Sequence, residues 1–167
     1  MTKLFAFSFS MTPPPPPRPA LALHEFNEFA IELPVHWRQL PTPQDNTFAY
    51  ESPMDQASLV ISADFYEIPA DKAQLIAEKN LETRLAANAE RTGGPVEVIS
   101  QGIKPHSGGP GLELHYLAAG IDGHVVAYLG YVTSRKVLNF TLVCGPDRDR
   151  AIALYNEMVA RFRAKLP

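Results

Sequence analysis

The chain has little of what a disulfide-stabilised, metal-binding or membrane-spanning protein needs. Among its 167 residues there is one cysteine, Cys144, which excludes an intramolecular disulfide framework and a cysteine-rich metal site. No apolar run approaches the roughly 20 residues that cross a bilayer as a helix. Lysine and arginine together number 15 against 18 aspartates and glutamates, so no basic excess indicates nucleic-acid binding. We therefore expect no metal site, no nucleic-acid partner and no membrane span.

What remains is the composition of one globular domain preceded by a proline-rich leader. Hydrophobic residues make up 46% of the chain and charged residues 20%, and at this length a folded chain buries about two-thirds of its surface. Proline is the unusual count, at 16, and five prolines are consecutive from Pro13 to Pro17. Such a run favours an extended polyproline II spacer and cannot enter a helix interior or a central strand. We expect residues 1–23 to be a disordered leader and residues 24–167 to form a single domain.

The leader has a second interpretation as a secretory signal. Lys3 would be its charged start, and Ala20-Leu21-Ala22 its small-residue cleavage site. The apolar stretch before the prolines is short, however, and a proline block ahead of a cleavage site is atypical. We therefore expect a cytoplasmic protein with an uncleaved leader, for which Met11 is a second candidate start. The alternative is a periplasmic protein from which residues 1–22 are removed.

Hydrophobic periodicity predicts seven strands and two helices. Alternation typical of half-buried strands places Leu59, Ile61 and Phe65 on one face, and the same period recurs in other segments. Strands are expected at residues 26–33, 47–51, 58–68, 96–104, 111–119, 124–133 and 137–144. Helices are expected at residues 70–91 and 148–166, where good helix formers and apolar residues recur at helical spacing. Strand runs interrupted by single helices indicate an α+β fold, with a central, mostly antiparallel sheet of six or seven strands and two main helices packed on it.

The reactive side chains do not form a recognisable catalytic or metal-binding pattern. The five histidines lack the close spacing of metal ligands, and the predicted hairpin pairs His115 with either Gly130 or Tyr128, never with His124. Cys144 ends an apolar strand, which favours a buried thiol over an activated nucleophile. We therefore expect no enzyme and no cofactor. A small hydrolase that uses His115 or Cys144 is the rival interpretation.

Aromatic and histidine side chains on the strands are candidates for a binding surface. Amphipathic rings give contact area at low rotamer cost and keep a polar tip that can orient a partner. The two predicted helices have one apolar stripe each, so part of the sheet could stay uncovered and attract a partner. The residues expected to bind a protein or peptide partner are Tyr66, His115, Tyr128 and Tyr131.

Short motifs along the whole globular part resemble those of one bacterial family. They are Leu-Pro-x-x-Trp at residues 33–37, the hairpin strand from Ser58 to Ser62, Gly-Gly-x-Gly-x-Glu-x-x-Tyr at residues 108–116, and an amphipathic closing helix that ends Arg161-Phe162-Arg163. In this layout, over about residues 26–166, the chain resembles the DcrB-like, PsbP-like α/β/α sandwich proteins. The resemblance implies a curved antiparallel sheet with helices packed on it, and no catalytic residues.

The relatives implied by this resemblance differ in where they act. DcrB-like members are periplasmic or lipid-anchored, and this sequence has no lipobox cysteine near its start. Eag-type chaperones of type VI secretion share the fold, are cytoplasmic and dimeric, and hold apolar effector segments on the sheet. We therefore expect a non-enzymatic chaperone or adaptor that docks an apolar or extended polypeptide segment on its sheet, as a homodimer. The alternatives are an exported DcrB-like periplasmic factor, or a small-ligand-binding domain with its cleft beside the hairpin of residues 111–133.

Overall fold

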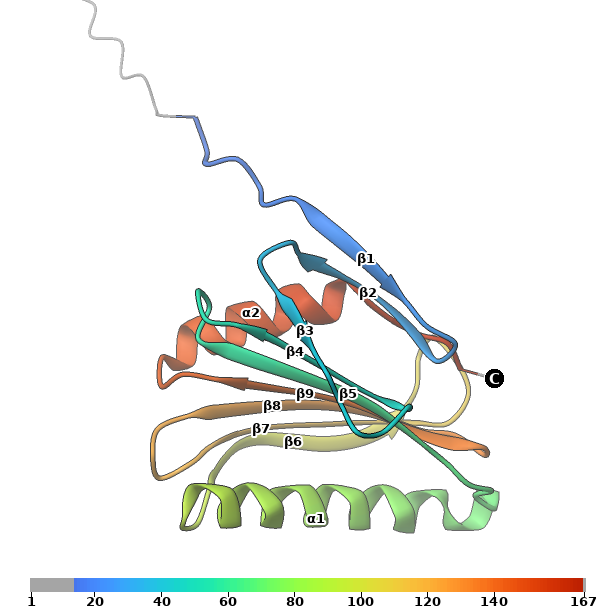
Figure 1. The fold of residues 1–167 in the computed structure, drawn as a ribbon. Helices are drawn as coiled ribbons and strands as arrows, with labels where there is room; N and C mark the ends of the chain where they lie inside the picture. Colours follow the sequence, from blue (N-terminus) through green and yellow to red (C-terminus); the bar gives the residue numbers. More distant parts are fainter. Residues whose placement is uncertain (1–13, 167) are drawn as a thin grey trace, which may run out of the picture.

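The computed structural model describes residues 14–166 and separates a proline-rich start from a folded body. Residues 14–20 have no regular secondary structure and lead away from the body (Figure 1). The folded part begins earlier than expected, because Leu21–Glu25 forms strand β1 and pairs with β2 (Phe29–Pro34). The domain boundary predicted at residue 24 therefore falls inside a strand. The disorder expected for residues 1–13 concerns a part of the chain outside the described residues.

Seven antiparallel strands form the large sheet at the centre of the molecule (Figure 1). Their spatial order, from one edge to the other, is β3 (Arg38–Leu40), β4 (Thr47–Ser52), β5 (Ala57–Phe65), β9 (Lys136–Cys144), β8 (Val125–Val132), β7 (Leu112–Ala119) and β6 (Glu97–Pro105). A smaller sheet has the order β1, β2 and β10 (Phe162–Ala164). The prediction of an α+β fold with a mostly antiparallel central sheet is confirmed.

Helix α1 (Ala73–Thr92) covers one face of the large sheet. A short 3-10 turn, Ala70–Lys72, precedes it, and the left-handed Gly93, with a φ of 77°, ends it. The helix packs on β7 and β8 and runs beneath the strands in Figure 1. Val60, on the same face of β5, stays 40% exposed because the helix does not extend over that strand. The side chains buried between helix and sheet are Ile68, Ala77, Leu81, Leu114, Tyr116, Ala118, Val126, Tyr128, Val132 and Val137.

Helix α2 (Arg148–Ala160) and the small sheet cover the opposite face. Asp147 caps α2, because its carboxylate accepts a hydrogen bond from the Arg150 N–H at 3.0 Å. The core between these layers is aliphatic and aromatic. Its largest fully buried members are Phe29, Ile31, Leu33, Tyr50, Leu59, Ile61, Leu138, Phe140, Leu142 and Met158.

The last helix is shorter than predicted. The sequence pattern extended it to Leu166, whereas α2 ends at Ala160 and β10 follows. Phe162 turns into the core, where its ring centroid lies 5.7 Å from that of Phe29 and 5.1 Å from that of Phe140. The helical spacing was therefore misleading here. Pairing with β2 buries the same apolar side chain while it satisfies the backbone of the strand.

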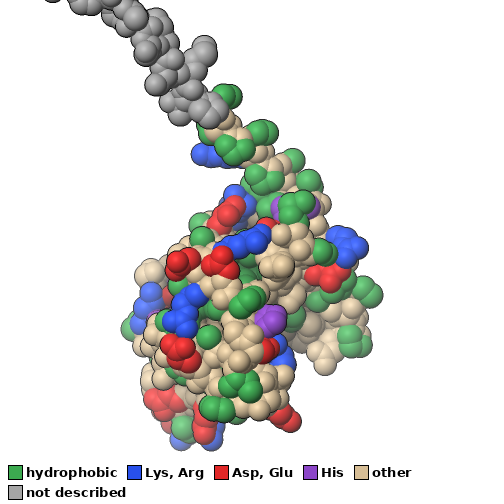
Figure 2. Space-filling view, turned by 90° about the vertical axis from the view of Figure 1, so that its left-hand side faces the viewer, with side chains coloured by type: hydrophobic (Ala, Val, Ile, Leu, Met, Phe, Trp, Pro, Cys, Tyr) green, Lys and Arg blue, Asp and Glu red, His purple; other side chains and the backbone are tan. Residues whose placement is uncertain are grey.

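Charged side chains of both signs lie on the surface of the molecule. Figure 2 shows acidic and basic groups interspersed over one face of the body, with hydrophobic side chains between them. Several of these groups form surface ion pairs, such as Arg38 with Glu51 at 2.5 Å and Lys79 with Glu82 at 3.0 Å. Within residues 14–166, no helix combines the length and the apolar character needed to cross a membrane.

Candidate functional site

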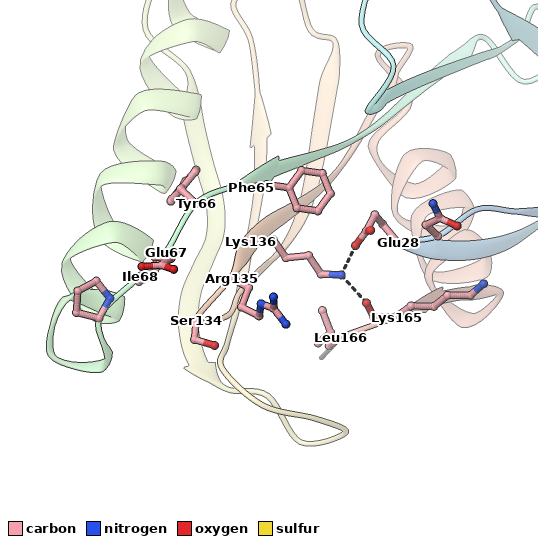
Figure 3. A pocket seen from close by; sticks show the side chains of 12 residues that line it. Glu28, Phe65, Tyr66, Glu67, Ile68, Ser134, Arg135, Lys136, Lys165 and Leu166 are labelled. Carbon is pink, nitrogen blue, oxygen red and sulfur yellow. Dashed lines mark hydrogen bonds and ion pairs between the residues drawn. The ribbon is translucent and has the colours of Figure 1, made fainter.

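A groove of about 880 Å³ opens at the end of the large sheet where β5 finishes (Figure 3). It combines the aromatic rings of Phe65 and Tyr66 with charged and backbone groups. We call it the Phe65 groove. The segments that line it are far apart in the sequence: residues 27–28, 65–69, 134–136 and 165–166.

The path of β5 explains why two aromatic side chains are exposed there. Strand β4 pairs with β5 only as far as Ser62, opposite Thr47, whereas β5 runs on to Phe65 beside β9. Beyond the strand, the N–H of Tyr66 donates to the carbonyl of Arg135 at 3.2 Å, which holds the chain against the turn before β9. Consecutive residues of an extended chain point to opposite sides. With no β4 residue beside them, Phe65 and Tyr66 are 57% and 47% exposed.

A buried ion pair lies beside these aromatic rings. The ammonium group of Lys136 donates to the carboxylate of Glu28 and, at 2.6 Å, to the carbonyl of Lys165 (Figure 3). The Lys136 side chain is 7% exposed and that of Glu28 is 24% exposed. A backbone hydrogen bond joins the same two segments, because the Lys165 N–H donates to the Glu28 carbonyl at 2.9 Å. Since the chain itself neutralises Lys136, the exposed Arg135 is a positive charge in the groove that an occupant can reach.

A second hollow, of about 380 Å³, adjoins the Phe65 groove and shares Phe65 with it. Four phenylalanines, one alanine and five acidic or amide residues line it. The ring centroids of Phe26 and Phe48 lie 4.0 Å apart, and that of Phe29 lies 5.2 Å from that of Phe48. Phe65 therefore stands between two hollows, each lined by aromatic rings together with charged and amide side chains.

The four residues predicted to bind a partner lie in three different places. Tyr66 lines the Phe65 groove, Tyr128 lies beneath α1, and Tyr131 and His115 face the layer that contains α2. Tyr131 is 9% exposed, and its ring stacks on that of His106 with the centroids 4.7 Å apart. The structure does not gather the four on one face. Their contact with a partner stays a prediction, and Tyr66 is the one with extensive exposed surface.

His115 pairs with Leu129 of β8, between the two registers that the sequence analysis considered. The N–H of Gly120 donates to the carbonyl of His124 at 2.9 Å, and the length of this turn sets the register. The predicted pairings of His115 were therefore wrong by one residue. A Cβ atom at Gly102 would lie 2.7 Å from Cε1 of His115, so the imidazole occupies the space over that glycine. It also borders a hollow of about 190 Å³ beside α2.

Tyr128 belongs to a polar network that the sequence analysis did not identify. Its hydroxyl accepts a hydrogen bond from the Asn80 amide at 2.6 Å and donates to Oδ1 of Asn139 at 2.8 Å. The Arg84 guanidinium lies 4.8 Å from the centroid of the Tyr128 ring, a cation–π contact. Asn139 in turn donates to the Asp64 carboxylate at 3.1 Å. Burial raises the pKa of Tyr128 to about 12, so a neutral phenol joins helix and sheet.

The single cysteine lies in surroundings that disfavour the thiolate. Burial, with a smaller effect of the Asp55 carboxylate, raises the pKa of the Cys144 thiol to about 11. Although partial burial opposes it, hydrogen bonds with His36 at 2.7 Å and Ser52 at 2.8 Å lower the pKa of Asp55. A cysteine nucleophile needs the opposite environment, one that favours the thiolate. In the part of the chain that the structure describes, no three histidine, cysteine or acidic side chains are grouped to hold a metal ion.

Comparison with known proteins bears on the fold. Neither a protein-family model nor a curated protein matches the sequence. Among solved structures, the chain is similar to the solution structure of cyanobacterial PsbP (CyanoP) from Synechocystis sp. PCC 6803. The TM-score is 0.62 at 16% sequence identity, over 93% of this chain and 98% of that chain. A crystal structure from Bacteroides thetaiotaomicron VPI-5482 gives a TM-score of 0.43 at 13% identity, over 83% of this chain and 45% of that chain, too low to carry an argument. The chain thus has a PsbP-like fold, as its motifs predicted, while the relation to DcrB and to type VI secretion chaperones stays a prediction.

Proposed function

We propose that the chain is a non-enzymatic binding domain that docks an apolar, extended polypeptide segment in the Phe65 groove. The observation that carries this proposal is the exposure of two consecutive aromatic side chains, Phe65 and Tyr66, in a groove of about 880 Å³. Aromatic side chains are enriched at protein interfaces because they bury a large area at a low cost in rotamer entropy. Apolar side chains gathered on a surface, with polar groups around them, are typical of interaction sites.

A polypeptide suits this surface better than a small ligand does. The groove and the adjoining hollow of about 380 Å³ meet at Phe65, so a chain-like occupant can pass both sides of one ring. Small-molecule sites instead bury most of their ligand in a single concave cavity. The exposed guanidinium of Arg135 adds a hydrogen-bond donor for the carbonyl oxygens of such an occupant.

The hollow beside the hairpin supports the small-ligand alternative less well. Its volume is about 190 Å³, below the roughly 300–1,000 Å³ of ligand pockets. His115 and Tyr155 border it, and the Tyr155 hydroxyl already donates to the Tyr128 carbonyl at 3.4 Å. We therefore propose the Phe65 groove, and not the hollow beside the hairpin, as the binding site.

A chaperone or adaptor role in the cytoplasm completes the proposal and rests on the resemblance in the sequence. Strand β1 supports the cytoplasmic location. Cleavage after Ala22 would remove Leu21 and Ala22, two of the five residues of β1 that pair with β2. The mass of the protein isolated from its own cells tests this. A chain that begins at Leu23 or His24 would establish the exported alternative.

Peptide selection tests the groove with a defined probe. Displayed random peptides are selected on the wild-type protein, and one enriched peptide is titrated into the wild type and three variants. We expect apolar residues to be enriched. Phe65→Ala and Tyr66→Ala should each weaken binding about tenfold or more, as truncation of an aromatic anchor does.

Met54→Ala is the matched control for these variants. Met54 is 70% exposed and lies before β5, at the end of that strand opposite to Phe65. The peptide should bind this variant as it binds the wild type. Equal affinity for all variants, or no enrichment of apolar peptides, would contradict the proposed function.

A further inference from the structure

The outer side of β6 is the longest uncovered strand edge in residues 14–166. Strand β6 has nine residues and pairs only with β7, whereas the strand at the opposite edge, β3, has three residues. Apart from its ladder with β7, no backbone hydrogen bond joins β6 to the rest of the described chain. Its outward N–H and C=O groups are therefore available to a strand from another molecule.

A β-bulge determines which side chains of β6 share a face. Val98 pairs with Ala118 and Ser100 with Leu117, so Ile99 is the extra residue. Directly paired residues lie on the same face of a sheet. Because the β7 partners are known to face α1 or the opposite layer, the face of each β6 residue follows. Facing α1 are Val98, Gln101 and Ile103, and facing the other side are Glu97, Ser100, Gly102 and Lys104.

When Ile99 is left out, β6 is complementary to itself in the antiparallel direction. Two copies aligned around Gln101 place Glu97 opposite Lys104, Val98 opposite Ile103, Ser100 opposite Gly102, and Gln101 opposite its own equivalent. Both members of every pair lie on the same face, as antiparallel pairing requires. Two-fold axes through other residues of β6 also pair side chains of the same face. The axis at Gln101 is the one that sets Glu97 opposite Lys104.

We infer that β6 is a homodimer interface, in which two copies of the chain pair antiparallel around a two-fold axis at Gln101 and continue the large sheet. Charge complementarity identifies a second copy as the occupant of this edge. The side chains of Glu97 and Lys104 are 65% and 59% exposed at opposite ends of one strand. The two-fold axis places Glu97 of each copy opposite Lys104 of the other copy, so that the two charges attract.

The surroundings of these charges favour the same arrangement. Within one chain Glu97 bonds to Arg148 at 2.8 Å, and Lys104 to Glu113 at 3.1 Å. At each end of the dimer interface the order of charges is Arg148 and Glu97 of one copy, then Lys104 and Glu113 of the other copy. The charges therefore alternate in sign, and each has neighbours of opposite sign. On the α1 face, Val98 is 42% exposed and would meet Ile103 of the second copy.

This interface shares no residue with the Phe65 groove, so the two proposals can fail independently. Lys104, Pro105 and the bulge are features that discourage an edge strand from pairing with other strands. In the register centred on Gln101, Glu97 of the second copy offsets the charge of Lys104.

Cysteine cross-linking tests the register. In Gln101→Cys the substituted side chains of two copies face each other, with Cβ atoms about 4.5–5.5 Å apart, close to the spacing of a disulfide. Mild oxidation should give a covalent dimer of twice the 18.4 kDa chain mass. Ile103→Cys is the control and should stay uncross-linked, because it faces Val98. The native Cys144 is buried. Equal cross-linking of both variants, or of neither, would overturn the register.

Charge reversal tests the interface without new covalent bonds. Glu97→Lys or Lys104→Glu alone sets like charges together at both ends of the dimer, and each should raise the dimer dissociation constant about tenfold or more. The double variant restores opposite charges and should return within about threefold of the wild type. Sedimentation equilibrium measures the constants, and thermal melting confirms that each variant is folded. A wild type that stays monomeric, or a double variant no tighter than the single ones, would overturn the inference.

Discussion

Asn139 and Phe140 are neighbours on β9 and both are buried, yet they face layers of different character. Phe140 faces α2 and the small sheet, and its ring centroid lies 5.1 Å from that of Phe162. Asn139 faces α1, where its side chain bonds to Tyr128 and Asp64. Around Phe140 the contact is therefore apolar, whereas around Asn139 directional hydrogen bonds are added to the buried area. Beyond the reach of both layers, the end of β5 keeps its aromatic side chains in water.

The largest effect is expected from a cavity on the apolar side. Phe140→Ala should lower the free energy of unfolding by about 3–5 kcal/mol, because a buried aromatic ring is replaced by a void. Phe65→Ala is the matched change at an exposed ring, and it should alter stability by only about 0.5 kcal/mol. Urea denaturation of both variants measures the difference. Similar losses would show that Phe65 is part of the core.

The next effect concerns the ion pair beside the groove, where the two partners differ in burial. Glu28→Ala should cost about 3 kcal/mol, because it leaves the buried ammonium group of Lys136 without its carboxylate. Lys136→Met should cost about 1 kcal/mol or less, since the more exposed Glu28 can be solvated and the stem stays packed. Urea denaturation of both variants measures the difference between their losses in free energy of unfolding. A larger loss for Lys136→Met would contradict the assigned burial.

A smaller effect separates two buried phenols, one from each layer. Tyr128→Phe should cost about 1–3 kcal/mol, because it leaves the amides of Asn80 and Asn139 without their shared partner. Tyr50 is equally buried on the other side, and its hydroxyl has no hydrogen-bond partner within the described residues. Tyr50→Phe should therefore change stability by about 0.5 kcal/mol or less. Equal losses from both changes would break the comparison between the layers.

The two phenols should contribute equally to the pH dependence of stability in alkali. Burial raises the pKa of both Tyr50 and Tyr128 to about 12, from an ordinary value of 10.0. Unfolded tyrosines lose their protons near the ordinary value, whereas the folded ones keep them. The contribution of these two protonated phenols to the free energy of unfolding is thus complete below about pH 10 and is lost as the pH rises through about 12. Unfolding free energies across this range measure the effect for Tyr50→Phe and Tyr128→Phe, and each variant should reduce the pH dependence to a similar degree.

Local patterns in the sequence predicted most strands but not the exposure of the site. Alternation identified β5 and β9, because a buried sheet face imposes a period of two. The same alternation grouped Phe65 with the buried Ile61, and only the early end of β4 leaves Phe65 exposed. The helical spacing of Phe162 likewise could not reveal that β2 offers it a partner strand. These outcomes depend on tertiary contacts, which periodicity does not contain.

The residues of the candidate site differed in how far the sequence alone could identify them. Tyr66 was identified as an aromatic side chain on a strand, whereas Arg135 and Lys136 resemble the charged residues of any turn. Asn139 did carry a signal, because a lone amide side chain in an apolar strand indicates a buried hydrogen-bond network. Its partners on α1 could not be found from spacing alone, since the distance between helix and strand along the chain is long.

The most direct test of the account is to map where a selected apolar peptide binds, by backbone amide NMR of the full chain. We expect the largest shift changes in residues 65–69 and 134–136, around the Phe65 groove. The amides of β6 and those beside His115 should stay unchanged. Shift changes that gather along β6 or around His115, with residues 65–69 unaffected, would contradict the central claim.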